Sequence, residues 1–321
     1  MTQVAGLALP FFGLIFLGFL AGRFWRRDES ELGWLNIFVI YIALPAMFFE
    51  LISKTPIEEL ANGTFVFATS LATYTAFTLA FVFALAKTRG NIAESTMQGM
   101  VGGYGNVGYM GPPLAIVTLG PAAAAPAALI FCFDVALVFT LAPLMMAFAG
   151  AGGRSSSSVL VEIPRKVLLH PFIVATLIGV AAAAAELRPP DPIDRLLVLL
   201  GNAAAPCALF ALGVTVASRR LKRIPTELPI LIFIKLVIHP LLALGILTWI
   251  GGFEPVWVAT AVLMASLPPA ATIYVLATQY KTYVLRASSA IVIGTMASVF
   301  TVTAVLYIIT QNSQPAGTFA P

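Results

Sequence analysis

The sequence predicts an all-α integral membrane protein of ten transmembrane helices, arranged as two inverted five-helix repeats. Of its 321 residues 60% are hydrophobic and 10% are charged, and the mean hydropathy of +0.96 excludes a soluble globular domain. Apolar segments of about 20 residues, the length that crosses a bilayer, recur along the chain. A Gly/Ser-rich stretch at residues 150–158 divides them into two sets of five. An odd number of helices in each half inverts the second half relative to the first.

The expected helices occupy nearly the whole chain, so the function must lie within the bilayer. The predicted divisions are a first repeat (1–149), a cytoplasmic linker (150–165), an inverted second repeat (166–310) and an external tail (311–321). The ten predicted helices are residues 4–24, 31–52, 61–86, 95–119, 121–149, 166–185, 192–217, 227–250, 255–279 and 284–310.

Basic residues gather in the loops that follow the odd-numbered helices, which hold 14 of the 18 lysines and arginines. By the positive-inside rule these loops face the cytoplasm, which places both termini outside a plasma (inner) membrane. The net charge of +4 therefore follows the topology and does not indicate a nucleic-acid partner. The 14 residues are Arg23, Arg26, Arg27, Lys87, Arg89, Arg154, Arg165, Lys166, Arg219, Arg220, Lys222, Arg223, Lys281 and Arg286.

The two halves also resemble each other in sequence. The Pro-Phe dipeptide at residues 10–11 recurs at 171–172, and residues 44–49 match 205–210 at the same offset of 161. A proline pair at 112–113 recurs at 268–269, at an offset of 156, and one shorter loop accounts for the difference. Three matches in the same order favour an internal repeat over chance.

The two proline pairs interrupt the fourth and ninth predicted helices. Proline lacks an N–H donor and clashes with the preceding turn, so neither segment forms a continuous helix. Lipid cannot satisfy the backbone groups that are freed, so protein or a water-filled cavity must cover each break. Broken segments at matching places in two halves are the best sequence indication of a transporter binding site.

The breaks favour an anionic ligand. Because proline is well tolerated in a first helical turn, each pair is expected to begin a half-helix whose N-terminal N–H groups attract negative charge. The alternative is a pair of kinks that only shape helix packing.

Residues 103–108 spell G-x-G-x-x-G, but no strand precedes them, so no dinucleotide cofactor is expected. The candidate substrate-binding residues are Asn106, Tyr109, Gly111, Pro112, Pro113, Ser266, Pro268 and Pro269.

Two charged residues lie in the middle of predicted helices. Asp134 is in the fifth and Lys235 in the eighth, and a charge facing lipid there costs about 2.5–3.5 kcal/mol. We expect both to face the interior, either as a structural pair or as groups that couple proton or sodium movement to transport. His239 follows Lys235 by one turn and shares its face. No metal site is expected from the scattered histidines and cysteines.

The stretch Gly-Asn-Val-Gly-Tyr-Met-Gly-Pro-Pro-Leu (residues 105–114) resembles the signature of the auxin efflux carrier family, which includes plant PIN carriers and bacterial organic-acid permeases. The ten helices, the outside termini and the second proline break extend the resemblance to the whole chain. It implies the fold of bile-acid symporters and sodium–proton antiporters. In that fold, helices 1, 2, 6 and 7 form a scaffold, helices 3–5 and 8–10 form a mobile domain, and crossing helices 4 and 9 bind the substrate at their breaks.

Carried over residue by residue, Asn106 and the first proline pair match the first crossing helix, and the second proline pair matches the second. By helix alone, Asp134 and Lys235 correspond to the acidic and lysine residues of sodium–proton antiporters. The chain departs from the family in having a short central loop and no asparagine beside its second proline pair, where Ser266 stands as a substitute.

We therefore expect a secondary active transporter of a small organic anion, a mono- or dicarboxylate of the malonate, malate or auxin-like kind, working by an elevator-type movement. Its expected partners are that anion and the lipid bilayer, with a homodimer as the alternative to a monomer. No nucleophile–base set or P-loop emerges, so an enzyme is not expected. The alternatives are a sodium–proton antiporter, which would carry no organic ligand, and an anion channel, which would pass current without saturating.

Overall fold

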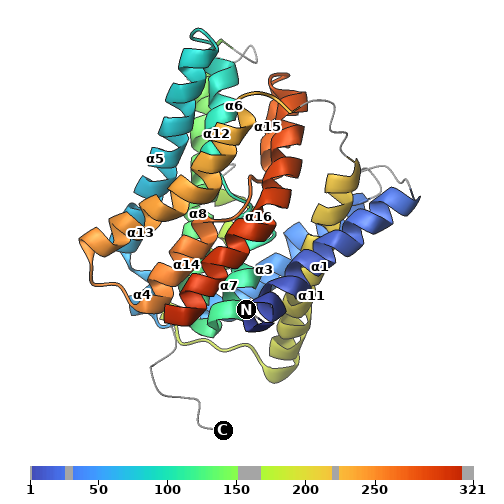
Figure 1. Cartoon of the computed structure of the whole chain (residues 1–321). Coiled ribbons are helices and arrows are strands. Elements are labelled where there is room, and N and C mark those ends of the chain that lie inside the picture. Colours follow the sequence, from blue (N-terminus) through green and yellow to red (C-terminus); the bar gives the residue numbers. More distant parts are fainter. Residues whose placement is uncertain (1, 26–31, 151–167, 219–223, 313–321) are drawn as a thin grey trace.

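The computed structural model describes residues 2–25, 32–150, 168–218 and 224–312, and these are helical almost throughout (Figure 1). Among them there is no sheet, and the extended backbone forms one isolated bridge, between Gly105 and Pro269. The predicted all-α class is confirmed. The predicted linker (150–165) and external tail (311–321) lie almost entirely outside the described residues.

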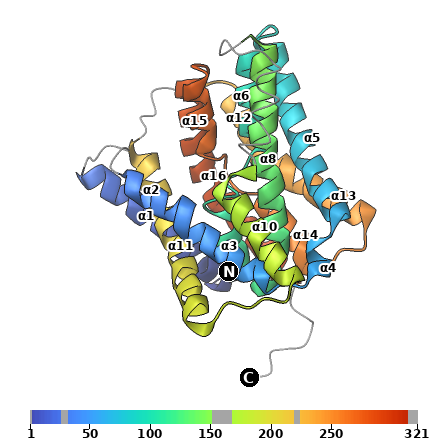
Figure 2. The same cartoon turned by 180° about the vertical axis from the view of Figure 1, so that it is seen from behind.

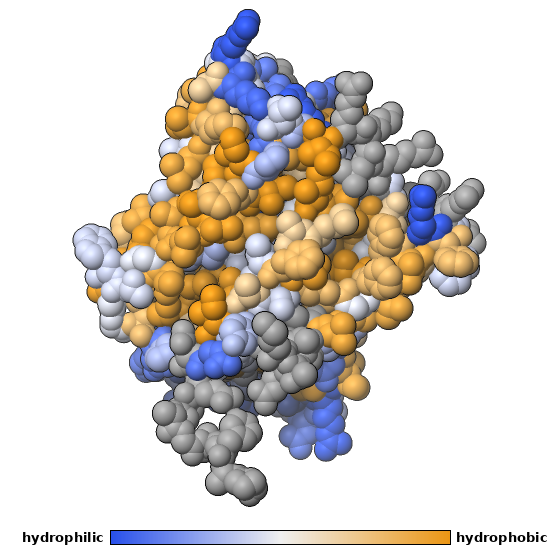
Figure 3. Space-filling view, viewed as in Figure 1, coloured by the Kyte–Doolittle hydropathy of each residue, from blue (hydrophilic) through white to orange (hydrophobic). Residues whose placement is uncertain are grey.

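Within the described residues, six helical segments are long and apolar enough to cross a membrane: Gly33–Ser53, Ile57–Lys87, Pro121–Phe148, Asp191–Ser218, Leu228–Ile250 and Val284–Gln311. Shorter apolar helices cover Leu9–Trp25, Pro171–Ala184 and Pro255–Ala265. Figure 3 shows the consequence at the surface, a broad hydrophobic band between two hydrophilic ends. The chain therefore has the surface of a multi-pass membrane protein.

The first part of the chain forms helices on both sides of its break. These elements are α1 (Thr2–Trp25), α2 (Gly33–Phe38), the π-helical turn η2 (Val39–Ala43), α3 (Leu44–Ser53), α4 (Ile57–Leu60), α5 (Gly63–Lys87), α6 (Ile92–Gly103), α7 (Gly111–Leu119), the 3-10 turn η3 (Pro121–Ala123) and α8 (Ala124–Phe148).

The second part of the chain is also helical on both sides of its break. Its elements are α10 (Pro171–Ala184), α11 (Asp191–Ser218), α12 (Leu228–Phe233), the π-helical turn η4 (Ile234–Ile238), α13 (His239–Ile250), α14 (Pro255–Ala265), α15 (Thr272–Gln279) and α16 (Val284–Asn312).

The helices pack in two groups, visible from both sides in Figures 1 and 2. The α1–α11 group comprises α1, α2, η2, α3, α10 and α11, and its closest packing is α1 along α11. A Cβ added to Gly18 would collide with the Phe210 carbonyl, and one added to Gly213 would collide with the Ile15 carbonyl. Helices α5–α8 and α12–α16 form the crossing group, named for the two broken helices that it contains, and the short α4 contacts α10 of one group and α8 of the other.

Two π-helical turns arise where proline follows in the same helix. Pro240 cannot donate to a carbonyl one turn back, so the hydrogen-bond pattern widens over η4, immediately before His239. The same occurs at η2, before Pro45. Such turns are frequent at functional sites, and η4 contains Lys235, which is fully buried.

A cluster of charges ties together the ends of four helices in the crossing group. The Glu227 carboxylate accepts hydrogen bonds from the Tyr283 hydroxyl at 3.1 Å and from Arg286 at 3.2 Å, and Lys87 lies 3.7 Å away. Arg286 also pairs with Glu94 at 2.6 Å. Burial and the Glu227 carboxylate raise the pKa of Tyr283 above its ordinary range, so this phenol stays a donor.

Replacing Glu227 by glutamine is expected to lower the free energy of unfolding by about 1 to 3 kcal/mol, because Lys87 and Arg286 then lack a shared carboxylate. Thermal unfolding of the purified protein in detergent measures the change. Glu58→Gln, at an exposed carboxylate on α4, is the matched control and should leave the unfolding temperature unchanged. Equal unfolding temperatures for the two variants would contradict the role given to Glu227.

A second cluster of charges lies in the α1–α11 group, where α3 ends. Lys54, at the end of α3, pairs with Glu50 at 2.5 Å and with Asp194 of α11 at 2.9 Å. Hydrogen bonds to Glu50 and Asp194 raise the pKa of Lys54, so it remains charged. Arg188 donates to the Ser53 carbonyl at 3.0 Å. These contacts join α3 to the segment that leads into α11.

Candidate functional site at the two helix breaks

The site begins with the two interruptions predicted from the proline pairs. The first helix stops at Gly103 and resumes with α7 at Gly111, and Tyr104 has extended backbone angles. The second stops at Ala265 and resumes with α15 at Thr272. Both breaks therefore lie where the sequence indicated that a helix cannot continue.

The two breaks contact each other through their backbones. The Asn106 N–H donates to the Pro268 carbonyl at 2.8 Å, and the Ala270 N–H donates to the Tyr104 carbonyl at 3.3 Å. These bonds flank the bridge between Gly105 and Pro269. Proline lacks an N–H but keeps its carbonyl, so Pro268 can still accept a hydrogen bond in the second break. Backbone groups that lipid would leave unsatisfied are thus paired inside the protein.

Glycines allow this close contact. A Cβ on Gly294 of α16 would lie 2.5 Å from Pro269 Cδ, and one on Gly105 would lie 3.1 Å from Lys235 Nζ. A Cβ on Gly111 would lie 2.5 Å from Met264 Sδ. Larger side chains at the first two positions would push the two breaks apart or displace the lysine.

One detail of the sequence prediction is wrong. Pro112 and Pro113 lie in the first turn of α7, as expected, but Pro268 and Pro269 do not begin α15. They lie in the extended segment before it, because the Pro268 carbonyl is committed to the Asn106 N–H and the Ala270 N–H to the Tyr104 carbonyl. The half-helix starts three residues after Pro269, at Thr272.

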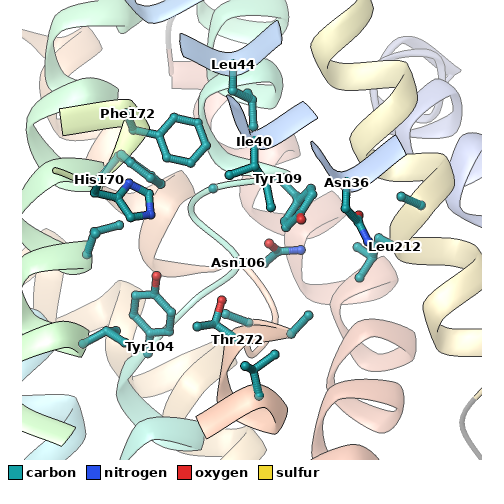
Figure 4. A pocket seen from close by; sticks show the side chains of 18 of the residues that line it. Asn36, Ile40, Leu44, Tyr104, Asn106, Tyr109, His170, Phe172, Leu212 and Thr272 are labelled. Carbon is teal, nitrogen blue, oxygen red and sulfur yellow. The ribbon is translucent and has the colours of Figure 1, made fainter. Parts of the chain in front are cut away.

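A cavity of about 240 Å³ lies beside the paired breaks, between the two groups of helices (Figure 4). Asn106, Tyr109 and Thr272 line it from the crossing group, and Asn36 and Thr215 line it from the α1–α11 group. The Asn106 side chain is 2% exposed, and its amide nitrogen has no hydrogen-bond partner among the described residues. A buried donor without a partner is costly unless a ligand or water satisfies it.

Aromatic and apolar side chains complete the cavity. Tyr104 and His170 lie on one side of Asn106 in Figure 4, and Tyr109 and Asn36 lie on the other. The His170 ring stacks on Phe172, with their centroids 5.1 Å apart. No lysine or arginine is among the described residues that line the cavity. Neutral polar side chains and the start of α15 are therefore the groups that face a ligand here.

The other predicted substrate residues do not line the cavity. Gly111, Pro112 and Pro113 are buried in the first turn of α7, and the second proline pair is used in the backbone pairing. Ser266 is fully buried, and its hydroxyl donates to the Leu263 carbonyl of its own helix at 2.7 Å. It does not replace the asparagine that the second crossing lacks.

The three predicted coupling residues meet in one chain of polar contacts inside the crossing group. Lys235 Nζ lies 3.1 Å from His239 Nδ1 and donates to the Ala265 carbonyl at 2.5 Å. His239 Nε2 lies 3.3 Å from the Thr73 hydroxyl, which donates to Asp134 at 3.2 Å. Among the described residues, no direct salt bridge joins Asp134 to Lys235.

Several of these residues did not stand out in the sequence. Asn36, Thr73 and Thr215 are uncharged polar residues inside apolar helices, where hydroxyls commonly bond their own backbone. Thr272 and Tyr104 adjoin the breaks, and position beside a break is the signal that would have identified them. Asn36 and Thr215 come from helices distant in sequence, so only the packing of the two groups brings them to the cavity.

The comparisons with known proteins agree with this architecture. The family described as "Membrane transport protein" matches residues 4–307. A protein of Rhizobium meliloti (strain 1021) named "Putative malonate transporter" is 50% identical over 319 residues, covering 99% of this chain and all of the relative. An "Uncharacterized transporter" of Methanothermobacter thermautotrophicus is 25% identical over 292 residues, covering 89% of this chain and 91% of the relative.

A third relative extends the likeness at lower identity. The "Uncharacterized transporter YfdV" of Escherichia coli (strain K12) is 23% identical over 314 residues, covering 96% of this chain and 98% of the relative. Matches of this extent include both breaks and both groups of helices. The chain therefore belongs to this family of membrane transport proteins, the auxin efflux carrier family indicated by residues 105–114, and it is a transporter rather than an enzyme.

Proposed function

We propose that this protein is a secondary active transporter that carries a small organic anion, a mono- or dicarboxylate, across the plasma membrane. The observation that carries the proposal is the cavity at the paired helix breaks, into which Asn106 presents a buried amide nitrogen without a partner. The name of the Rhizobium relative supports a short dicarboxylate of the malonate kind as the first substrate to test.

The lining of the cavity favours a carboxylate. Asn106, Tyr109 and Thr272 offer neutral donors, and the N-terminal turn of α15 begins beside it. Helix N-termini attract anions because their first N–H groups are unpaired and the helix dipole is positive there. A cavity of about 240 Å³ suits an acid of a few carbons rather than a large amphiphile.

The position of the cavity favours an elevator movement. Asn106 and Thr272 belong to the crossing group, whereas the opposite wall, with Asn36 and Thr215, belongs to the α1–α11 group. If the crossing group slides against a fixed α1–α11 group, the substrate travels with the paired breaks while the opposite wall changes. The charge cluster around Glu227 supports this by holding the crossing group together as one unit.

We propose ten transmembrane helices in two inverted repeats, with both termini outside. Helices lie in all ten predicted ranges, two of them broken, which supports the count. The α5–α6 connection lies at the opposite end of the molecule from the end of α16 (Figure 1), which supports placing Lys87 and Arg89 at the cytoplasmic face.

We also propose that Asp134, Lys235 and His239 couple proton movement to transport. Asp134→Asn is expected to abolish the pH dependence of substrate uptake in proteoliposomes, because an amide cannot take up the proton. Asp191→Asn, at an exposed carboxylate in the first turn of α11, is the control and should keep that dependence. Uptake by Asp134→Asn with an unchanged pH profile would show that this carboxyl has no coupling role.

A binding screen tests the proposed substrate class. Thermal unfolding of the purified protein is measured with malonate, malate, succinate and an aromatic acid, each at two pH values and with or without sodium. We expect at least one carboxylate to raise the unfolding temperature saturably. Stabilisation by sodium alone, with no carboxylate effect, would instead favour the sodium–proton antiporter.

A further inference from the structure

One unbroken line of hydrogen bonds runs across the interior of the crossing group. It starts at Asp134 on α8, passes through Thr73 on α5 and His239 at the start of α13, and reaches Lys235 in the π-helical turn η4. The successive donor–acceptor distances are 3.2, 3.3 and 3.1 Å. All four side chains are nearly or completely buried, with exposed fractions between 0 and 5%.

The donors and acceptors along this line fit a single direction. An ammonium group has donors only, so Lys235 donates to His239 Nδ1, which must then be unprotonated. The ring proton is therefore on Nε2 and is donated to the Thr73 hydroxyl oxygen. That leaves the Thr73 proton for the Asp134 carboxylate, which agrees with the donor role of Thr73 in that bond. One histidine tautomer, with the proton on Nε2, is therefore compatible with all three hydrogen bonds of the line.

Thr73 differs from a neighbouring threonine on α5 in its hydrogen-bond partners. Its neighbour one turn earlier, Thr69, bonds the Phe65 carbonyl at 2.9 Å, as a threonine in an apolar helix usually does. Thr73 instead bonds two side chains of other helices. Both threonines border a small void of about 10 Å³ together with Asp134 and His239. Thr69 is thus a matched reference for Thr73.

The lysine end of the line contacts both helix breaks. Lys235 donates to the carbonyl of Ala265, the last residue of α14, where helical carbonyls lack partners in their own helix. Lys235 also fills the space beside Gly105, where an added Cβ would lie 3.1 Å from its nitrogen. The charge of Lys235 therefore stabilises the backbone of the two helix breaks.

We propose that Thr73 completes a proton relay between Lys235 and Asp134, a proposal that rests on the proposed transport function. In the relay, Lys235 releases a proton to His239 Nδ1, His239 Nε2 releases its proton to the Thr73 oxygen, and Thr73 releases its own proton to Asp134. Three N–H or O–H bonds break and three form. The ammonium becomes an amine, the carboxylate becomes a carboxylic acid, and His239 changes tautomer while staying neutral.

The relay removes both buried charges in one concerted sequence. The Ala265 carbonyl then loses its charged donor, so the end of α14 is held less strongly at the second break. In the part of the chain that the structure describes, the other titratable side chains that interact with Asp134 are Tyr74 on α5 and Tyr104 in the first break. α14 itself contains no titratable residue. Among the described residues, the protons available to this line are therefore those of its own members and of these two phenols.

Proton and carboxylate fluxes in proteoliposomes test the relay. Wild-type protein, Thr73→Val, Thr73→Ser and Thr69→Val are reconstituted with a pH-sensitive dye inside, and malonate-driven acidification is recorded. We expect Thr73→Val to lower this proton flux at least tenfold with malonate affinity unchanged, Thr73→Ser to restore it, and Thr69→Val to match wild type. Wild-type proton flux in Thr73→Val, or failure of Thr73→Ser to restore it, would overturn the relay.

A second measurement decides the relay even if no carboxylate is carried. The chain has only two histidines, so nitrogen-15 NMR of histidine-labelled protein resolves His239 once His170→Gln has identified the other signal. Because the transfer conserves the number of protons on the line, we expect a neutral ring whose proton exchanges between Nε2 and Nδ1, and Nε2–H alone in Thr73→Val. A ring in the wild type that holds one tautomer alone, with the proton fixed on Nδ1 or on Nε2, would overturn the relay. Absence of malonate uptake alongside the expected tautomer change would count against the proposed function only.

Discussion

Replacing Lys235 by methionine is expected to lower the free energy of unfolding by about 3 to 5 kcal/mol, the usual cost of removing one member of a buried charge pair. Lys235 is fully buried, and its ammonium is a donor to the Ala265 carbonyl and to His239. Methionine fills the same volume but leaves the Asp134 carboxylate without a nearby cation. Chemical unfolding of the purified protein in detergent measures the loss.

The double variant Asp134→Asn with Lys235→Met separates charge from packing. It removes both charges, so we expect it to recover most of the stability lost by Lys235→Met while remaining inactive in coupled transport. Lys281→Met, at an exposed lysine between α15 and α16, is the control and should be as stable as wild type. A double variant as unstable as Lys235→Met would show that Lys235 acts by packing or by its bond to Ala265 alone.

Replacing Asn106 by alanine is expected to weaken carboxylate binding by about 10- to 100-fold, the effect of losing about 1.5 to 3 kcal/mol in a hydrogen bond to a charged group. The backbone N–H of Asn106 still donates to the Pro268 carbonyl in this variant, so the two breaks stay paired. Isothermal titration with malonate measures the affinity, and the unfolding temperature without ligand checks the fold.

Two further variants sharpen this test. Asn106→Asp preserves the shape but replaces the amide donor with a carboxylate, so it should weaken binding at least as much as alanine because like charges repel. Asn202→Ala, at an exposed asparagine on α11, is the control and should bind like wild type. Wild-type affinity in a well-folded Asn106→Ala protein would remove Asn106 from the binding site.

Much of the fold follows from local sequence properties. Hydropathy and length predicted helices in all ten ranges, because a helix is the way for a single segment to satisfy its backbone in lipid. The proline pairs predicted both breaks, because proline acts within one turn of its own position. The start of α15 was not predictable from Pro268 and Pro269 alone, since a bond to Tyr104, far away in the sequence, fixes it.

The candidate site was predictable only in part. Asn106 stood out because it adjoins a break, and Asp134 and Lys235 stood out because a charge inside an apolar helix demands an explanation. The threonine between them did not, because Thr73 and Thr69 look alike in sequence and differ only in which groups reach them. The wall of the cavity that contains Asn36 and Thr215 depends on packing between the two helix groups, which local sequence patterns do not predict.

Counterflow of radiolabelled malonate in proteoliposomes tests the central claim most directly, namely that a carboxylate is carried at the paired breaks by a saturable transporter. With wild-type protein, unlabelled malonate inside the vesicles is expected to accelerate uptake of labelled malonate from outside, with saturation, and Asn106→Ala is expected to abolish this at low substrate concentration. A current that neither saturates nor shows counterflow, or ion exchange with no movement of any carboxylate, would contradict the account.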